Sequence, residues 1–174
     1  MSTFVLIEKY TVGAGGASSV TLGSGGTIPQ TYTDLVVKIS GRTDNTGTFA
    51  NMIRFNGDTG SNYNWKNLYG YNSATYSDSF PSATYVWGGY TNNSSLTASS
   101  FGNSEIYVPN YRASIYKSVS ADGVMETNAS TGVSLGLGAN IWNNTAAITS
   151  ITCIPYVGNY AQYSTFYLYG ILKA

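Results

Sequence analysis

The sequence predicts an all-β protein, built as a β-sandwich or a β-barrel. Many short runs rich in Val, Ile, Thr, Tyr and Phe are separated by clusters of Gly, Asn, Ser and Asp, which is the pattern of short strands joined by turns. Helical periodicity is almost absent. The 174 residues show no internal repeat and no change of composition that would indicate a linker, so we expect a single domain over residues 1–174.

Ten segments are predicted to be strands, because each is a short run of β-branched, aromatic or aliphatic residues between turn signals. In chain order they are Phe4–Val12, Leu35–Gly41, Met52–Phe55, Tyr63–Tyr71, Thr84–Trp87, Glu105–Val108, Ser114–Ser120, Val133–Leu137, Ile148–Ile154 and Thr165–Leu172. Three minor strands are weaker candidates, and Ser19–Leu22 is one of them.

Alternation along two of these runs predicts which faces are buried. Leu35, Val37 and Ile39 share one face of their strand, although Val36 interrupts the pattern on the other. In Thr165–Leu172 both faces are apolar. This predicts a strand that is central in its sheet, with one face on the core and the other against a partner or a loop.

Turns are predicted at segments rich in Gly, Asn and Asp, which tolerate the positive φ of tight turns. These segments are 13–16, 23–26, 44–47, 56–60 and Asp122-Gly123. Residues 72–103 are rich in Ser, Asn, Thr and Tyr and are predicted to form long loops. Thr91–Ser100 and Glu126–Thr131 are candidate helices that lack a convincing apolar stripe.

Charge and histidine content narrow the function. The chain has eight basic and eight acidic residues, a net charge of zero and no histidine. We expect no nucleic-acid binding, which needs clustered Lys and Arg, and no membrane insertion, because no apolar run approaches about 18–20 residues. Without histidine the usual general base and most zinc sites are missing, so we expect no enzyme activity, no metal site and no cofactor.

The few charged and reactive side chains have ordinary structural interpretations. Paired carboxylates could support a glycosidase, but the acidic residues fall mostly in turns or at strand ends. The only cysteine, Cys153, is predicted to be a small buried apolar side chain in a strand. Such a weakly charged chain suits a protein that functions within an assembly.

A concentration of aromatic residues is the strongest binding signal. It consists of Trp65, Tyr69, Tyr71, Trp87 and Tyr90, which fall around predicted loops. Aromatic rings stack on sugars, anchor protein interfaces and fill cores. The sequence leaves all three interpretations open for these residues.

A second motif is a loop that superficially looks like a calcium site. It lacks the alternating ligands and the distal Glu of an EF-hand. A loop closed by hydrogen bonds from Asn and Asp side chains is favoured instead. Its defining residues are Phe55, Asn56, Gly57, Asp58, Asn62 and Tyr63.

Several sequence blocks carry a family resemblance. In chain order they are Met52–Tyr63, Glu105–Tyr111, Tyr116–Ser118, Thr145–Thr152 and Ser164–Ile171. This order resembles a family of tailed-bacteriophage virion proteins that includes fibre and decoration domains. The loop block is the most distinctive, and the strand blocks gain weight from their order.

The resemblance implies an antiparallel, jelly-roll-like β-sandwich exposed on a virus particle, usually as a homo-oligomer and often as a trimer. It supplies no catalytic residues, and the loop from Phe55 to Tyr63 would be fixed against the sandwich. A short chain without a coiled-coil or collagen-like shaft favours a capsid decoration or cement protein over a whole fibre. Its partners would be the major capsid protein or other virion proteins on the capsid surface, after synthesis in the host cytoplasm. The alternative is a receptor- or glycan-binding module of a head or tail fibre, with a host glycan as ligand.

Overall fold

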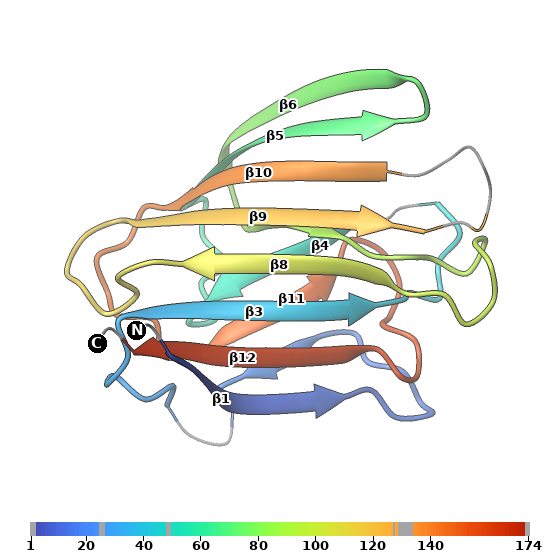
Figure 1. Cartoon of the computed structure of the whole chain (residues 1–174). Helices are drawn as coiled ribbons and strands as arrows, with labels where there is room; N and C mark the ends of the chain where they lie inside the picture. The colour runs from blue at the N-terminus through green and yellow to red at the C-terminus, as the bar shows by residue number, and fades with distance from the viewer. Residues whose placement is uncertain (1–2, 25–26, 48–49, 127, 129–133, 173–174) are drawn as a thin grey trace.

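The protein consists of two antiparallel β-sheets packed face to face (Figure 1). The computed structural model describes residues 3–24, 27–47, 50–126, 128 and 134–172. The predicted fold class, an all-β antiparallel sandwich, is confirmed. Successive strands cross repeatedly between the two sheets, as they do in a jelly roll. None of the residues in these ranges forms a helix long and apolar enough to cross a membrane.

The larger sheet has eight strands and the smaller has four. In sheet order the larger contains β1 (Thr3–Thr11), β12 (Thr165–Leu172), β3 (Asp34–Gly41), β8 (Gly102–Val108), β9 (Lys117–Met125), β10 (Ser134–Trp142), β5 (Tyr63–Tyr71) and β6 (Ala74–Ala83). The smaller contains β2 (Val20–Leu22), β11 (Ile151–Pro155), β4 (Ala50–Phe55) and β7 (Val86–Tyr90). The smaller sheet therefore covers only part of the larger one.

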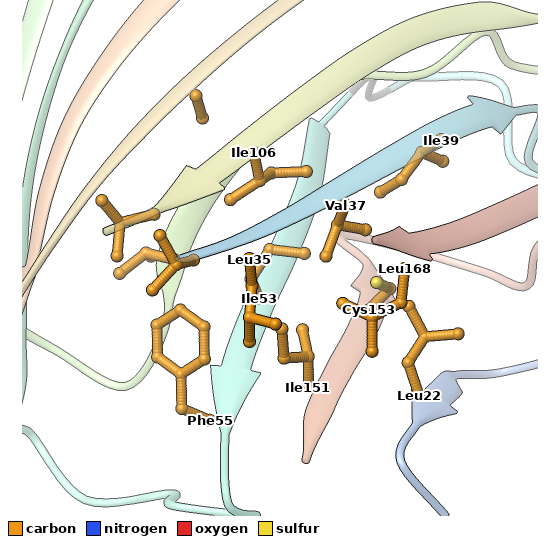
Figure 2. Close-up of a cluster of buried hydrophobic side chains, with 14 of the residues drawn as sticks. Leu22, Leu35, Val37, Ile39, Ile53, Phe55, Ile106, Ile151, Cys153 and Leu168 are labelled. Atoms are coloured by element: carbon orange, nitrogen blue, oxygen red, sulfur yellow. The ribbon is translucent and has the colours of Figure 1, made fainter. Parts of the chain in front are cut away.

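The main core lies where β3, β8 and β12 face β4 and β11 (Figure 2). Leu35, Val37 and Ile39 are buried there, as their alternation predicts. Val36 is buried on the opposite face, between its cross-strand neighbours Tyr107 and Tyr169, which explains the break in the pattern. Hydrophobic burial of this kind is the main stabilising contribution to the sandwich.

Cys153 lies inside this core (Figure 2), and its cross-strand neighbours in register are Ile53 on β4 and Val20 on β2. Burial raises the pKa of its thiol to about 12. The thiol is therefore protonated at neutral pH and packs as a small apolar group, as the sequence predicts.

The segment predicted as long loops contains a strand that the sequence analysis missed. β6 spans ten residues and pairs only with β5 at the edge of the larger sheet. Its residues are almost all exposed, so no alternation of buried apolar side chains marks it in the sequence. The candidate helix Thr91–Ser100 is wrong, because these residues form turns. The other candidate helix, Glu126–Thr131, lies mostly outside the described residues, as does the first residue of the predicted strand Val133–Leu137.

Two smaller predictions are also corrected. Asp122 and Gly123 are not a turn but lie inside β9. Gly123 is required there because a Cβ atom would lie 2.4 Å from the backbone N of Tyr90, where β7 crosses the larger sheet. The last strand, β12, is one strand in from the sheet edge rather than central, because β1 pairs along its outer side.

The most unusual strand is β10, whose alternation is reversed. Gly136 and Gly138 face the interior of the sandwich, whereas Leu135, Leu137 and Ile141 face outward. An antiparallel sheet normally turns its apolar residues inward and its polar residues to solvent. The inward positions are glycine because the ring of Trp87 of β7 lies against β10 so closely that only glycine leaves room for it.

We predict that Gly138→Ala destabilises the protein by about 1–3 kcal/mol, because overpacking a tight interior has that cost. The added Cβ would lie 2.5 Å from Cε3 of Trp87, which is itself buried and unable to move aside. Urea denaturation followed by tryptophan fluorescence measures the change.

The matched control is Gly70→Ala in the neighbouring strand β5, where the added Cβ would meet nothing closer than 3.8 Å. Alanine is more favourable than glycine inside a strand by about 0.5–1 kcal/mol, so this variant should be no less stable than the wild type. Equal stability of the two variants would contradict the packing argument.

Candidate functional site

An aromatic cleft opens where the larger sheet extends beyond the smaller one. The hairpin β5–β6 lies at the end of the larger sheet opposite β1 (Figure 1). Its inner face overhangs β7, the edge strand of the smaller sheet, and together they enclose a cleft of about 310 Å³. The lining includes seven aromatic side chains, namely Trp65, Tyr69, Phe80, Tyr85, Trp87, Tyr90 and Tyr156.

The structure brings together four of the five aromatic residues singled out in the sequence. Trp65, Tyr69, Trp87 and Tyr90 line the cleft, whereas Tyr71 does not. The two tryptophans are only 7% and 2% exposed, so their main role is to fill the interior. The tyrosines are more accessible. The tryptophans of the cleft are therefore buried, and its accessible aromatic rings are mainly those of tyrosines.

Sequence reasoning missed three members of this cleft. Phe80 comes from β6, the strand without a sequence signal, and stacks on Trp65 with ring centroids 4.3 Å apart. Tyr85 lies before β7, and Tyr156 follows β11. The sequence offers no alternation of apolar and polar residues over 74–83 that would have placed Phe80 in a strand.

The polar groups of the cleft are one carboxylate and several hydroxyls. Burial, the charge of Asp78 and a hydrogen bond with Asp78 raise the pKa of Tyr69. Burial, together with the charges of Tyr69 and Asp78, raises the pKa of Tyr90 to about 12. Both tyrosine hydroxyls are therefore protonated at neutral pH, and both lie within the electrostatic reach of the Asp78 carboxylate.

Two side chains in the cleft wall offer donors. The amide Oδ1 of Asn67 accepts a hydrogen bond from the backbone N–H of Asp78 at 3.1 Å, which leaves Nδ2 as the donor end. The indole N–H of Trp65 is buried and has no hydrogen-bond partner among the described residues. Such an unsatisfied buried donor costs about 1–3 kcal/mol unless a bound group satisfies it.

The opposite face of the same hairpin carries an apolar groove. Three hollows of about 380, 490 and 310 Å³ share lining residues and follow β5 along the outer face of the sheet. One wall is β10, with Leu135, Leu137 and Ile141, and the other is the serine-rich strand β6. Leu68 lies between them, directly across from Leu137 in strand register. Leu137 is 60% exposed, so this is a large apolar surface open to solvent.

The loop between β4 and β5 is a hydrogen-bonded structural element. Asn56, with a φ of 53°, accepts hydrogen bonds at Oδ1 from the backbone of Thr149 and Ser150 and donates through Nδ2 to the carbonyl of Ala147. These bonds attach the loop to the segment before β11. Within the described residues, no group of three or more His, Cys, Asp or Glu side chains is arranged to hold a metal ion.

Asp58 connects the same loop to β10. Its Oδ2 accepts a hydrogen bond from the indole N–H of Trp142 at 2.8 Å, and its Oδ1 accepts from the backbone of Gly60 at 2.8 Å. The buried Tyr63 hydroxyl donates to the carbonyl oxygen of Asp58 and accepts from the backbone N–H of Phe55. The motif residues thus hold the loop against the end of the sandwich.

Comparison of the chain with protein-family models, with curated proteins and with solved structures gives no match. Function must therefore be argued from the two surfaces of the β5–β6 hairpin and from the sequence blocks.

The Asp58 contacts generate a prediction about pH. Burial opposes ionisation of this carboxyl, but hydrogen bonds from Trp142, Asn62 and Gly60 outweigh it and lower its pKa below the ordinary value. A depressed pKa stabilises the fold above the unfolded-state pKa, and this stabilisation is lost as pH falls through the folded-state pKa. Asp58→Asn should therefore cost about 1–2 kcal/mol at pH 7 and progressively less below about pH 4.

Denaturant titrations of both proteins at pH 7 and pH 3 measure this difference. Asp122→Asn is the control, because burial and the charge of Glu105 raise the pKa of Asp122, so removing its charge should not destabilise the protein. A loss in Asp58→Asn that is the same at both pH values would show that the charge of Asp58 is not the cause.

Proposed function

We propose that the protein is a structural component of a tailed-bacteriophage particle, a decoration or cement protein of the outer capsid surface. In this role it binds the major capsid protein or neighbouring virion proteins as a homo-oligomer, most simply a trimer, and stabilises contacts between capsomers. The sequence blocks from Met52 to Ile171 support the phage assignment. The outer face of the larger sheet supports the role in assembly.

The outward-facing aliphatic residues of β10 are the observation that carries this proposal. Strand register places Leu135 beside Val124 of β9 and Leu137 beside Leu68 of β5, so these four exposed residues form a contiguous apolar surface. Ile141 lies further along the same face of β10, beyond Ala139. Single exposed apolar residues are ordinary, but a contiguous patch indicates an interface. Packing against Trp87 constrains only the inward positions of β10, which are glycine. Polar residues at the outward positions would not weaken the core, so core packing does not explain the apolar patch.

The chemistry of this surface fits permanent attachment to a particle. Its contact residues on β10 are aliphatic, and the charged residues beside them are Lys66 on β5, opposite Ala139, and Asp122 on β9, opposite Leu137. The ion pair between Lys38 and Glu105, at 2.8 Å, lies further along the sheet on β3 and β8. An apolar contact is insensitive to salt, whereas surface ion pairs are screened. Many copies in a symmetric array also bind with avidity, so each contact needs only modest affinity.

We predict that Leu135→Thr combined with Leu137→Thr abolishes self-association and capsid binding while leaving the fold intact. Threonine suits a strand, and substitutions at exposed sites usually change stability by no more than about 0.5 kcal/mol. Sedimentation velocity measures the oligomer, and co-sedimentation with particles that lack the protein measures capsid binding.

The control replaces two equally exposed apolar residues in loops, Ile115→Thr with Val157→Thr, and should bind as the wild type does. Wild-type association should also be unchanged between about 0.05 and 0.5 M salt, where ionic contacts would weaken. Particles without the protein that resist heat and chelators as well as complete particles would contradict the cement role.

The alternative function, a receptor- or glycan-binding module of a head or tail fibre, is favoured by the aromatic cleft. The two functions differ in where the protein sits on the particle. An electron-microscopy map of the purified virion separates them, because a cement protein occupies every equivalent lattice position and a fibre module does not.

A further inference from the structure

We infer that the aromatic cleft between the β5–β6 hairpin and β7 is a binding site for a neutral saccharide. The site uses the inner face of the hairpin, whereas the assembly surface uses the outer face, so this inference does not rest on the capsid role. It deepens the alternative function, glycan binding, by naming the site and the class of sugar. Three properties of the cleft support it: its shape, its hydrogen-bonding groups and its charge.

The shape and lining suit a sugar ring. The cleft volume of about 310 Å³ is at the lower end of the range of about 300–1,000 Å³ for small-molecule sites, which is room for a monosaccharide or disaccharide. Tyr69 and Tyr156 offer accessible rings, and Tyr156 is 53% exposed at the rim. The apolar face of a pyranose packs against such rings, because aromatic side chains bury a large area with little loss of side-chain freedom.

The polar groups require a ligand that both donates and accepts hydrogen bonds. The carboxylate of Asp78 only accepts, whereas Nδ2 of Asn67 and the indole N–H of Trp65 only donate. The buried Trp65 donor is unpartnered, so an acceptor oxygen from a ligand would satisfy it. Phe80 stacks on this indole with ring centroids 4.3 Å apart, and it is nearly half exposed on the edge strand. Sugar hydroxyls meet both requirements.

The charge of the cleft selects a neutral ligand. Asp78 is its one charged residue among the described lining, and no Lys or Arg is in that lining. A carboxylate without a basic neighbour repels sialic acids, uronic acids and phosphorylated sugars. A quaternary ammonium ion could stack on the same aromatic rings, but its ammonium group carries no acceptor for the Trp65 donor. The cleft therefore favours neutral sugars over both charged classes.

The test is binding of maltotriose, cellotriose and tri-N-acetylchitotriose to the purified full chain, measured by saturation-transfer NMR and by the fluorescence of the cleft tryptophans. Sialyllactose and choline are measured in parallel as anionic and cationic probes. We expect at least one neutral trisaccharide to bind, and Tyr69→Ala, Tyr156→Ala and Asp78→Asn each to weaken that binding at least tenfold.

The matched control is Tyr71→Ala, which removes an exposed tyrosine of the same strand that lies outside the cleft and should leave affinity unchanged. Circular dichroism and a denaturant titration establish that each variant is folded. The inference is overturned if no neutral saccharide binds at millimolar concentration, if the three cleft variants bind as tightly as the Tyr71 control, or if choline alone binds and depends on Asp78. The capsid-binding test uses the outer-face variant Leu135→Thr with Leu137→Thr, and its outcome does not depend on whether a saccharide binds. The two proposals can therefore fail separately.

Discussion

The structure depends on the close packing of Trp87 and Tyr90 against the glycine face of β10. At Gly138 and Gly136 an added Cβ would lie within 3 Å of the Trp87 ring. The same approach of β7 to the larger sheet requires Gly123, and Gly89 with a φ of +90° allows β7 to follow its path. Because protein interiors are packed as tightly as organic crystals, this corner admits no other arrangement of these side chains.

The position of β7 affects both the outer surface of β10 and the inner face of the β5–β6 hairpin. With bulky rings supplied by β7, the interior positions of β10 must be small, and the aliphatic residues of the strand are left for the outer face. On the inner side, β7 is the last strand of the smaller sheet, so β5 and β6 extend past it and the aromatic cleft opens there. This packing contact therefore sets which face of β10 points outward, and β5 takes part both in the apolar outer surface and in the aromatic inner cleft.

In this weakly charged chain, hydrogen bonds of Asn and Asp side chains hold strands and loops in place. Asn140, buried beside Trp87, accepts from the Trp87 backbone N–H at 3.1 Å and donates to the carbonyl of Val119. Asn51 links Tyr160 to Ser104 inside the sandwich. Side-chain hydrogen bonds of Asn56 and Asp58 likewise hold the loop before β5 in place. Side-chain amides can satisfy several backbone groups at once, which explains how a chain with so few charges fixes its loops.

The sequence by itself determined the fold class, the main core and most strands, because Leu35, Val37, Ile39 and similar runs carry a two-residue period that only a half-buried strand explains. It also grouped four of the cleft aromatics. Only the tertiary structure decided that β6 exists, since its stability comes from pairing with β5 and not from burial. It alone decided that Leu135 and Leu137 face outward, because alternation defines two faces without saying which one meets the core. That choice is made by a ring almost fifty residues away in the chain, Trp87, which leaves room for glycine and for nothing larger.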